Sequence, residues 1–583
     1  MTGEPRVLLE SWRPGEDGAS WAFDACEEIV TADRPDEVRP ALARIERAVA
    51  AGRHAAGFIS YEAAPGLRPD FITREGSGMP LLWFGVFRER HPRRPQAEPD
   101  CGERYEVTAW EPSIGVERYA AAVARVRDYI AAGDTYQVNL TFRQRFRFAG
   151  VSFGWYRALC RSQRAPFCAY IDTGRWQILS ASPELFFKRD GDRIEVRPMK
   201  GTIPRGRWPE EDDRQRELLK ESAKDRAENL MIVDLLRNDL GQIARVGSVT
   251  AESLFDVMTL PTLHQMTSTV TAACRPGTGF TELLEALFPC GSVTGAPKRR
   301  TMEIIRGLED GPRGVYTGCI GYLSPGNEAV FSVAIRTAVI DGQSGRGELG
   351  IGSGVTWDSR SDAEYAECIA KAAFARTVRP AFQLLETLLL EEGVWFLKSR
   401  HLARLGRTAS YFGYPFDLVR AEEMLAETAT SLPGRQRVRL LLYEDGGLTV
   451  ESVPVAPDPA DAELRVAFAP QAVDSREPFL YHKTTHRPWY ADLPPRPDCI
   501  DRLFVNERGE VTEGTIHNVV ARLGGELVTP PIESGLLPGV FREELLATGA
   551  IRERGIRREE LAGAEELFLI NSVRRWRRVR LVD

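Results

Sequence analysis

A break at Val378-Arg379-Pro380 divides this sequence more sharply than any other feature. A run with helical spacing ends at Thr377, and the strand-like run Phe382–Leu390 begins just after the proline. The residue before a proline disfavours the helical conformation, so helices usually end at such a point. The 583 residues also exceed one domain of roughly 150 residues several times over. We therefore predict one domain over residues 1–378 and a second over residues 381–583.

Two polar stretches divide these domains further. Arg88–Pro112 is rich in arginine, proline and glutamate, and we expect a linker there. Pro454–Pro459 is rich in proline and is expected to separate two lobes of the second domain. The predicted subdivisions are an N-terminal segment at 1–95, a catalytic core at 112–378, a small lobe at 381–455 and a large lobe at 462–583.

Composition and charge narrow the class of protein. Apolar residues make up 43% and charged residues 27%, as in globular proteins with substantial cores. The net charge of −7 disfavours nucleic-acid binding as the main function, and the basic tail Arg574–Arg578 is interpreted as a solvated edge. Neither a secretory signal at Met1–Trp12 nor a membrane-spanning run is present, and the nine cysteines lack close pairing. We expect a cytoplasmic protein that contacts no membrane.

Lysine is scarce in this chain. Of the 76 basic residues only eight are lysines, namely Lys188, Lys200, Lys220, Lys224, Lys298, Lys371, Lys398 and Lys483. Arginine cannot lose its proton in a protein, so it cannot act as a nucleophile. A genome that favours arginine explains the ratio equally well, but it does not explain which lysines remain.

Two pairs of carboxylates recur at helical spacing. Asp225 and Glu228 lie three residues apart in the helix-like run Ser222–Leu240, and Glu364 and Glu367 repeat this spacing with Lys371 one turn further on. Ser361-Asp362-Ala363-Glu364 has the pattern of a capping box. Either pair alone is typical of a solvated helix face. Four converging carboxylates would repel one another without a cation, and hard oxygen ligands favour Mg²⁺.

A glycine run and an arginine are candidates for binding an acidic substrate. Gly350-Ile351-Gly352-Ser353-Gly354 lacks the spacing of a dinucleotide-binding loop, but the exposed amides of a glycine turn can hold a carboxylate. Arg336 ends the strand-like run Phe331–Thr337, where its guanidinium could make a bidentate bond to an acid. A structural ion pair would explain Arg336 equally well.

Six motifs occur in one order along the first domain and together resemble the chorismate-utilising enzymes. They are Ser182-Pro183-Glu184, Pro198-Met199-Lys200-Gly201-Thr202, Asp234–Asp239, Gly295-Ala296-Pro297-Lys298, Gly318–Tyr322 and Glu364-Tyr365-Ala366-Glu367. The resemblance covers residues 1–378. It implies that Glu228 and Glu367 are the principal magnesium ligands, with Asp225 and Glu364 in support. It also implies that Arg336, Lys371 and the amides of Gly352, Ser353 and Gly354 hold the substrate's carboxylates.

Lys200 distinguishes among members of that family. The anthranilate synthases usually have alanine at this position, whereas the aminodeoxychorismate synthases commonly have a lysine, whose amine the resemblance makes the nucleophile that attacks the chorismate ring. Glu184 matches the family's general acid/base. Isochorismate-forming members have a lysine near the position of Gln137, so glutamine there argues against water as the nucleophile. An anthranilate-synthase type of first domain remains the alternative.

The roles of two features of the first domain are left undecided by the sequence. Family members often have a histidine directly before a Leu-x-Ser run, whereas here Gln265 stands in that place and His264 one residue earlier. Leu8-Leu9-Glu10-Ser11 resembles the family segment that contacts tryptophan. We favour a structural role or a bound ligand there over feedback control.

Four motifs of the second domain together resemble the class IV pyridoxal-phosphate enzymes. They are His401–Leu405, His482-Lys483-Thr484-Thr485, Val511–Asn518 and Gly535–Arg542. The cofactor needs a lysine for covalent attachment, an acid beside its ring nitrogen and donors for its phosphate. The resemblance assigns these roles to Lys483, Glu513, Arg404, Gly539, Val540 and Ser572. The family's common threonine is Phe541 here, which puts one phosphate contact in doubt.

The two resemblances together imply a fold and a reaction sequence. The fold is α+β, with packed antiparallel sheets and surrounding helices in the first domain and a two-lobed pyridoxal-phosphate fold in the second. The first domain would make 4-amino-4-deoxychorismate from chorismate and ammonia, and the second would eliminate pyruvate from it to give 4-aminobenzoate for folate. The alternative second activity is an aminotransferase acting on another amino acid. No segment resembles a glutamine amidotransferase, so we expect a separate one as partner, and class IV relatives suggest a homodimer.

Overall fold

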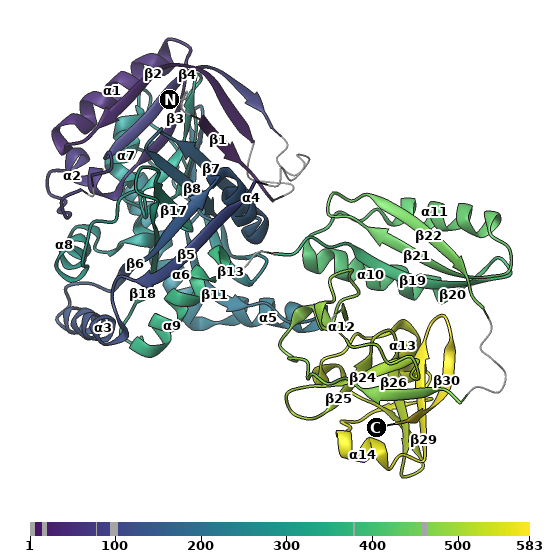
Figure 1. The fold of residues 1–583 in the computed structure, drawn as a ribbon. Helices are drawn as coiled ribbons and strands as arrows, with labels where there is room; N and C mark the ends of the chain where they lie inside the picture. Colours follow the sequence, from purple (N-terminus) through teal and green to yellow (C-terminus); the bar gives the residue numbers. More distant parts are fainter. Residues whose placement is uncertain are drawn as a thin grey trace. The chain divides into compact units, whose positions relative to one another are not determined.

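The computed structural model describes residues 6–13, 20–76, 78–93, 103–376, 379–456, 463–491 and 493–582. The chain forms two compact units (Figure 1). Unit 1 consists of Met1–Pro204 and Arg216–Arg379, and unit 2 consists of Arg205–Gln215 and Pro380–Asp583. The division at Arg379 lies beside the break in the sequence, although Thr377 and Val378 fall outside the described residues. Unlike the prediction, the short segment Arg205–Gln215 belongs to unit 2.

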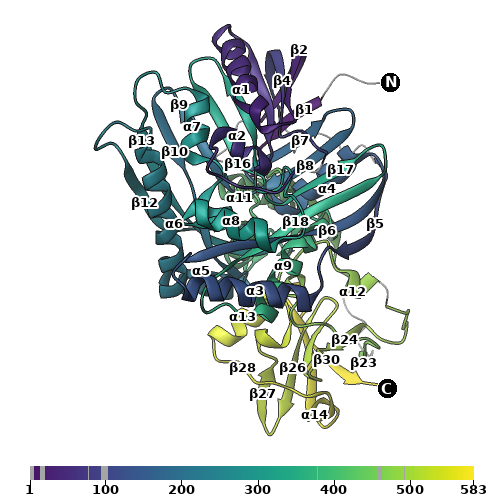
Figure 2. The ribbon, with the colours of Figure 1, turned by 90° about the vertical axis from the view of Figure 1, so that its left-hand side faces the viewer.

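The described strands of unit 1 form one connected network in which the paired strands are antiparallel (Figure 2). They are β1 (Arg6–Glu10), β2 (Trp21–Ala32), β3 (His54–Ile59), β4 (Leu82–Pro92), β5 (Tyr105–Pro112), β6 (Gln137–Gly150), β7 (Phe167–Asp172), β8 (Trp176–Ser182), β9 (Leu185–Asp190), β10 (Arg193–Val196), β11 (Met199–Pro204), β12 (Thr250–Thr259), β13 (Leu263–Ala273), β14 (Gly295–Ala296), β15 (Cys319–Ser324), β16 (Glu328–Val333), β17 (Thr337–Asp341) and β18 (Arg346–Val355). The mixed α+β fold expected for this domain is confirmed.

Helices cover the strands of unit 1. They are α1 (Pro35–Ala50), α2 (Ala64–Leu67), α3 (Val116–Ala131), α4 (Ser152–Gln163), α6 (Ala223–Gly241), α7 (Phe280–Leu287), α8 (Lys298–Leu308) and α9 (Ser361–Ala372), while α5 (Pro209–Glu221) begins in unit 2 and ends in unit 1. Helix α6 packs on β11 and β13, and α9 packs on β18. The two acid-bearing helices are thus fixed to strands that carry other predicted site residues.

The predicted linker at Arg88–Pro112 is mostly strand where the structure describes it. Strand β4 continues to Pro92, and β5 begins at Tyr105 and pairs with β6. Residues 94–102, in the middle of the stretch, lie outside the described residues. The polar composition fits this arrangement because one face of an antiparallel strand can be solvated.

The small lobe of unit 2 is a four-stranded antiparallel sheet with two helices. Its strands follow the order β20-β19-β21-β22. They are β19 (Leu384–Glu391), β20 (Val394–Phe396), β21 (Arg435–Leu442) and β22 (Leu448–Pro454), and the helices are α10 (Lys398–Phe412) and α11 (Leu418–Ser431). The strand predicted from the run Phe382–Leu390 is confirmed as β19. Leu388, Leu405 and Leu425 join the core between sheet and helices.

The large lobe of unit 2 is built on a mixed sheet in which β23 lies parallel to β24 and β30. Its strands are β23 (Arg465–Phe468), β24 (Asp501–Val505), β25 (Val511–Gly514), β26 (Asn518–Leu523), β27 (Glu526–Thr529), β28 (Arg552–Glu553), β29 (Glu566–Asn571) and β30 (Arg575–Leu581). Its helices are α12 (Pro488–Ala491), α13 (Val540–Ala547) and α14 (Arg558–Ala562). The predicted separator Pro454–Pro459 falls partly outside the described residues.

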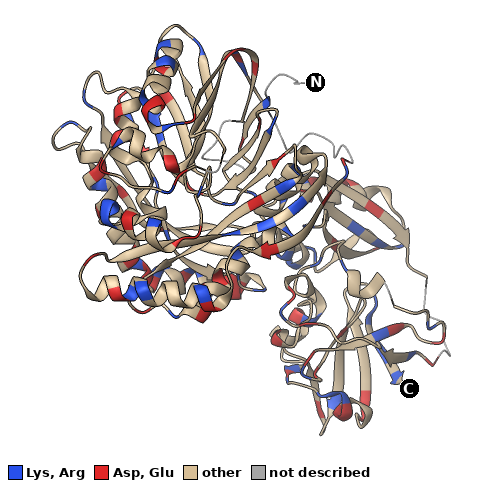
Figure 3. Cartoon of the chain, turned by 60° about the vertical axis from the view of Figure 1, so that its left-hand side comes forward, with Lys and Arg blue, Asp and Glu red and all other residues tan. Residues whose placement is uncertain are grey.

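Acidic and basic residues are interspersed along the helices of both units (Figure 3). Most of the ion pairs lie at the surface, where each contributes little to stability. Among the described residues, no helix is long and apolar enough to cross a membrane.

Several ion pairs are buried, and one of them fixes the wall of a cavity in unit 1. The Arg313 guanidinium donates to both Glu309 oxygens at 2.6 and 3.0 Å, and the two side chains are only 1% and 3% exposed. Arg313 also donates to the carbonyl oxygens of Val293 and Asn139 at 2.8 and 2.7 Å. Because every donor is matched, the charge is compensated.

We expect Arg313→Met to destabilise unit 1 by about 3–5 kcal/mol, since Glu309 would stay buried without its partner. Arg299→Met is the matched control, because Arg299 is 64% exposed and should contribute less than about 1 kcal/mol. Urea denaturation of both variants measures the difference. Equal midpoints for the two variants would contradict this account.

Candidate active sites in the two units

The predicted site residues of unit 1 meet around one cavity of about 290 Å³. They come from strands, helices and two loops that are far apart in the sequence. The cavity is lined by Glu184, Lys200, Asp225, Glu228, Arg336, Gly352, Gly354, Glu364, Glu367 and Lys371. Of the predicted unit 1 site residues, only Ser353 is missing from this lining.

Lys200 lies on β11 and faces the cavity. Burial lowers the pKa of its amine, while the nearby carboxylate of Glu228 acts in the opposite direction. A side chain at Gly354 would put its Cβ 3.0 Å from the Lys200 Nζ and 2.2 Å from the Gln137 Nε2. Glycine at 354 is therefore what leaves room for the amine.

Glu184 is buried between β8 and β9 on the same cavity. Burial raises the pKa of its carboxyl to about 7. Among the described residues, its Oε1 atom has no hydrogen-bond partner. Such a carboxyl exchanges a proton near neutral pH, which is what a general acid or base requires.

The four predicted metal ligands lie on α6 and α9 and line the cavity together. Burial, and then the neighbouring charges of Asp225 and Glu364, raise the pKa of Glu228, while Lys200 and Lys224 lower it. Lys371 Nζ lies 2.6 Å from Glu367, and Lys224 Nζ lies 3.9 Å from Glu228. Within the described ranges, no three acidic, histidine or cysteine side chains are grouped closely enough to hold a metal ion as they stand.

The capping box predicted at Ser361–Glu364 is wrong. Ser361 is the first residue of α9 and Arg360 is its N-cap, without a side-chain cap bond. Glu364 instead accepts a hydrogen bond of 2.7 Å from the Ser359 hydroxyl. On α6 the cap is Ser222, whose hydroxyl accepts from the Asp225 amide and also bonds its carboxylate. Serine hydroxyls thus orient one carboxylate of each pair.

The glycine run is a strand and not the predicted turn. Gly350–Gly354 pairs with β6 along its whole length, whereas β17 accompanies β18 only up to Leu349. Beyond Leu349 the second edge of β18 has no strand partner among the described residues. The Gly352 carbonyl accepts from Lys371 Nζ at 3.1 Å, so it points away from β6. In an antiparallel strand the amide of the same residue points the same way, toward the cavity.

Strand alternation explains why Ser353 does not line the cavity. Its side chain is buried, and its hydroxyl bonds the Tyr119 hydroxyl at 2.8 Å. Gly352 and Gly354, its neighbours, both line the cavity. Successive residues of a strand point to opposite sides, so the Ser353 side chain lies on the side opposite to the one where a side chain at Gly352 or Gly354 would lie.

Arg336 and Gln265 also face this cavity. Arg336 connects β16 and β17 with a left-handed backbone (φ +52°) and donates to Gln163. Burial lowers its pKa to about 10, so it remains a cation at neutral pH. Gln265 donates to the Gly201 carbonyl at 2.8 Å, while His264 is buried away from the cavity and bonds Thr259. Gln265, and not His264, therefore faces the cavity from the position where family members often have a histidine.

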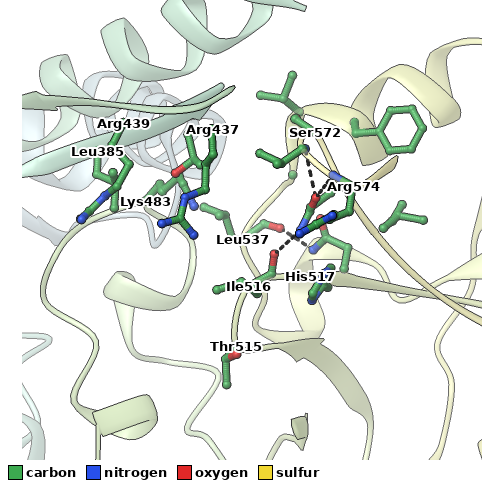
Figure 4. Close-up of a pocket in the computed structure, with 18 of the residues that line it drawn as sticks. Leu385, Arg437, Arg439, Lys483, Thr515, Ile516, His517, Leu537, Ser572 and Arg574 are labelled. Carbon is green, nitrogen blue, oxygen red and sulfur yellow. Dashed lines mark hydrogen bonds between the residues drawn. The ribbon is translucent and has the colours of Figure 1, made fainter. Parts of the chain in front are cut away.

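The predicted cofactor residues of unit 2 line a second cavity, of about 940 Å³ (Figure 4). It is lined by Arg404, Lys483, Glu513, Gly539, Val540 and Ser572. Lys483 lies opposite Ser572 and Arg574, and Arg437 and Arg439 extend from the small lobe on the side of Lys483 (Figure 4). All six predicted residues are therefore brought together.

Lys483 is the one lysine among the described residues that line this cavity. Burial lowers its pKa to about 7, and the charges of Arg487 and Arg404 add to the effect. Its backbone carbonyl accepts from the Leu385 amide at 3.0 Å, which ties it to β19. A large share of this amine is neutral at physiological pH.

Glu513 is a buried acid on β25 with two hydrogen-bond donors. Tyr490 donates to it at 2.8 Å and Asn518 at 3.3 Å. Burial raises the pKa of Glu513 to about 7. The carboxyl of Glu513 could therefore share a proton with a basic ring nitrogen of a ligand in this cavity.

The start of α13 forms a cradle of free amides. Gly539 is the N-cap, and a Cβ there would lie 2.0 Å from Asn518 Oδ1. The first amides of a helix lack intrahelical partners and attract anions. Arg404 donates to the Pro538 carbonyl at 2.9 Å and binds both oxygens of Glu386 at 2.8 and 2.7 Å. Arg404 thus also holds the cradle in place, and Phe541 offers no hydroxyl to it.

Sequence reasoning missed several residues of the second cavity. The lining includes five further arginines, namely Arg437, Arg439, Arg487, Arg574 and Arg577. The interpretation of Arg574–Arg578 as a solvated edge is therefore wrong for Arg574 and Arg577. Arg437 and Arg439 are two apart on β21, and that spacing could have shown that they share a face. Such a cavity suits a ligand with several negative charges.

Comparison with known families identifies the family to which unit 1 belongs. Residues 4–377 match the model of the chorismate binding enzymes. The chain belongs to the chorismate binding enzyme family. Residues 383–582 match the model of the class IV aminotransferases, which agrees with the two-lobed unit 2.

Individual relatives of the chorismate binding region differ in activity. An aminodeoxychorismate synthase component 1 of Escherichia coli is 43% identical over 263 residues, 45% of this chain and 57% of that protein. An anthranilate synthase component 1 of Aquifex aeolicus is 38% identical over 263 residues, 45% of this chain and 53% of that protein. The chain spans about half the length of these relatives. The structure of an anthranilate synthase component I from Streptococcus pneumoniae is 25% identical with a TM-score of 0.55, covering 64% of this chain and 95% of that one.

The class IV fold of unit 2 supports pyridoxal phosphate as its cofactor, and the cavity fits that group. A half-buried amine with a lowered pKa, a buried acid with a raised pKa and a cradle of helix amides lie on one cavity. When bound, pyridoxal phosphate withdraws electrons from a carbon next to an amine. Lys483 would hold it covalently, Glu513 would keep its ring nitrogen protonated, and the amides at Val540 would bind its phosphate.

The pKa of Lys483 gives a prediction for cofactor capture. Below pH 7 the amine is protonated and cannot react with an aldehyde, and above pH 7 it is neutral. We expect the rate of covalent capture by the cofactor-free chain to rise with pH and to level off above about pH 8. Stopped-flow absorbance measures the rate, with free Nα-acetyl-lysine as the control. A rate that keeps rising to about pH 10, as for an ordinary lysine, would contradict the assigned environment.

Proposed function

We propose that unit 1 converts chorismate and ammonia to 4-amino-4-deoxychorismate and that unit 2 eliminates pyruvate from it to give 4-aminobenzoate, a folate precursor. The observation that carries the proposal is the half-buried Lys200, whose amine has a lowered pKa and lines one cavity with Glu184 and the acids of α6 and α9. The aminodeoxychorismate synthases among the relatives support the same first reaction.

Lys200 acts as the nucleophile of the first reaction. Its neutral amine attacks ring carbon C2 of chorismate, the ring double bonds shift, and the hydroxyl at C4 leaves. Ammonia then adds at C4, and the C2–N bond to Lys200 breaks as the double bonds return. A desolvated amine suits this role because less of it is protonated.

Glu184 gives a proton to the C4 hydroxyl. The protonated hydroxyl then leaves as water. A carboxyl with a pKa of about 7 is half protonated at neutral pH, so it can give that proton and later take one from the incoming ammonia. Arg336, Lys371 and the amides along the open edge of β18 offer positive charge and donors for the two carboxylates of chorismate.

Mg²⁺ is part of the proposed site. Glu228 and Glu367 would be its principal ligands, with Asp225 and Glu364 in support. The donor set fits, because four carboxylates line one cavity and hard oxygen ligands suit this ion. Lys224 and Lys371, which now balance two of the acids, would have to release them. The ion would neutralise a substrate carboxylate.

We expect Glu228→Gln to raise the Mg²⁺ concentration needed for half-maximal activity of unit 1 by at least tenfold, because a charged ligand is lost. Asp234→Asn is the matched control, since Asp234 lies on the same helix but is exposed and pairs with Arg237. Titration calorimetry with Mg²⁺ and the initial rate measure the two effects. The same magnesium dependence in both variants would exclude Glu228 as a ligand.

In unit 2 Lys483 moves the protons of the second reaction. Its amine, with a pKa near 7, can take a proton from the substrate carbon and return it as pyruvate leaves and the ring becomes aromatic. The arginines of the cavity provide charge for the two carboxylates of this substrate. An aminotransferase is the second candidate, because the matching family model is that of class IV aminotransferases.

A separate glutamine amidotransferase would deliver the ammonia. The relatives named component 1 support a two-component enzyme. Glutamine should then replace ammonium only when such a subunit is added. A cytoplasmic location belongs to the same proposal, since all eight cysteines in the described part of the chain are free.

A product assay tests the proposal. The chain with chorismate, ammonium, Mg²⁺ and pyridoxal phosphate should form 4-aminobenzoate and pyruvate in equal amounts. Lys200→Ala should lower the formation of 4-amino-4-deoxychorismate at least a hundredfold, and Lys483→Ala should let this compound accumulate. Lys220→Ala is the control, since Lys220 is an exposed surface lysine. Formation of anthranilate, or exchange of 2-oxo acids with D-alanine in place of pyruvate release, would refute the proposal.

A further inference from the structure

Arg205–Gln215 is the one segment of unit 2 that lies outside the C-terminal part of the chain. It directly follows β11, the strand that carries Lys200. Its first six residues, Arg205-Gly206-Arg207-Trp208-Pro209-Glu210, contain two arginines and a tryptophan that no step of the proposed reactions uses. Within unit 2, Arg205 contacts α10, and Arg207 and Trp208 contact Tyr481, two residues before Lys483.

Arg205 and Gly206 fix the shape of the segment and attach it to α10. Arg205 makes a bidentate ion pair with Asp212, at 2.6 and 2.8 Å, and both side chains are less than 10% exposed. The Arg205 guanidinium lies 4.1 Å from the centre of the Tyr411 ring and donates to the Tyr411 carbonyl. The Tyr411 hydroxyl donates to the Gly206 carbonyl at 2.7 Å. A Cβ at Gly206 would lie 2.1 Å from the Asp212 nitrogen, so only glycine fits there.

Arg207 and Trp208 attach the segment to the chain just before Lys483. Arg207 donates to the Ser475 carbonyl and to the Tyr481 hydroxyl, both at 3.2 Å. Its guanidinium is held by Glu211 at 2.8 Å. The ring of Trp208 packs 5.1 Å from the ring of Tyr481. Tyr481 is therefore contacted by two successive residues of the segment.

His482, the residue next to Lys483, also bonds the segment. Its Nε2 lies 3.1 Å from the Arg207 carbonyl, and because a carbonyl only accepts, Nε2 carries the proton. Burial lowers the pKa of His482 to about 3, so the ring is neutral and has this one tautomer. On the other side, the Lys483 carbonyl is bonded by β19. The backbone at Lys483 is thus held between β19 and Arg205–Gln215.

We propose that Arg205–Gln215 is a positioning segment for the second active site and that Arg207 and His482 set the place of the Lys483 amine in its cavity. Arg207 contacts neither substrate nor cofactor, and acts through Tyr481 and His482. This inference uses pyridoxal phosphate as the ligand of Lys483 but does not depend on which reaction unit 2 catalyses.

Full-length variants test the first half of the proposal. Arg207→Ala removes the bonds to Ser475 and Tyr481, and Arg214→Ala is the control because Arg214 is an exposed residue of the same segment. The readouts are the dissociation constant of pyridoxal phosphate, the fraction of Lys483 labelled after borohydride reduction, and chorismate consumption by unit 1. We expect at least tenfold weaker cofactor binding for Arg207→Ala, with chorismate consumption unchanged. Wild-type binding and labelling in Arg207→Ala would overturn the proposal.

Two substitutions of His482 separate positioning from folding. His482→Gln keeps a donor for the Arg207 carbonyl, whereas His482→Leu keeps the volume but removes the donor. We expect the pH midpoint of the bound cofactor's visible absorbance to shift in the leucine variant by at least half a unit and to return toward wild type in the glutamine variant. Equal midpoints in the two variants would overturn the proposal.

The outcome is distinguishable from failure of the proposed function. A wild-type chain that binds the cofactor but releases no pyruvate refutes the lyase activity alone. The binding and absorbance differences among the Arg207 and His482 variants still decide the role of the segment.

Discussion

An ammonium group loses its hydration when a protein buries it, and no single neighbour fully replaces that hydration. The structure applies this constraint to two lysines, Lys200 and Lys483, each in the lining of a cavity. In both cases burial is the largest influence on the pKa and the nearest carboxylates oppose it only in part. Both lysines are half-buried, and the surrounding folds hold each amine at the wall of a cavity.

In unit 1 the Lys200 amine lies beside a sheet edge at which strand pairing is interrupted. Because β17 stops pairing with β18 at Leu349, the following glycines present their amides and carbonyls to a cavity instead of a strand. A side chain at Gly354 would also displace the end of the Gln137 side chain and crowd the Lys200 amine. In the proposed reaction, one edge would thus provide both donors for a substrate and space for the Lys200 amine. In unit 2 a loop does the equivalent work, and it is fixed by the contacts of Tyr481 and His482.

Much of this could be predicted from the sequence because the informative residues are close together in the chain. Helical spacing placed Asp225 with Glu228 and Glu364 with Glu367, and the proline at 380 marked the division between the units. Three features could not be predicted locally. Whether a glycine run is a turn or a strand depends on a partner strand some 210 residues away, β6. Ser361 does not cap α9, because the helix begins one residue earlier than predicted, with Arg360 as its N-cap. Membership of Arg205–Gln215 in unit 2 depends on contacts with residues about 200 to 275 positions later.

The charges of the first cavity would couple the binding of the proposed cation to the binding of the proposed substrate. Lys371 now pairs with Glu367 and also donates to the Gly352 carbonyl, so one amine spans an acid and the open strand edge. A divalent cation bound to Glu367, as proposed, would replace this amine as the partner of the acid, and Lys371 would then keep a positive charge without a carboxylate. A substrate carboxylate at the strand edge would pair with that charge. The binding of the cation and of the anionic substrate would therefore favour each other, with the coupling carried by Lys371. The same holds more weakly for Lys224, which lies 3.9 Å from Glu228 and is more exposed. In the structure, Lys224 and Lys371 therefore balance the charge of two acids of this cavity, Glu228 and Glu367.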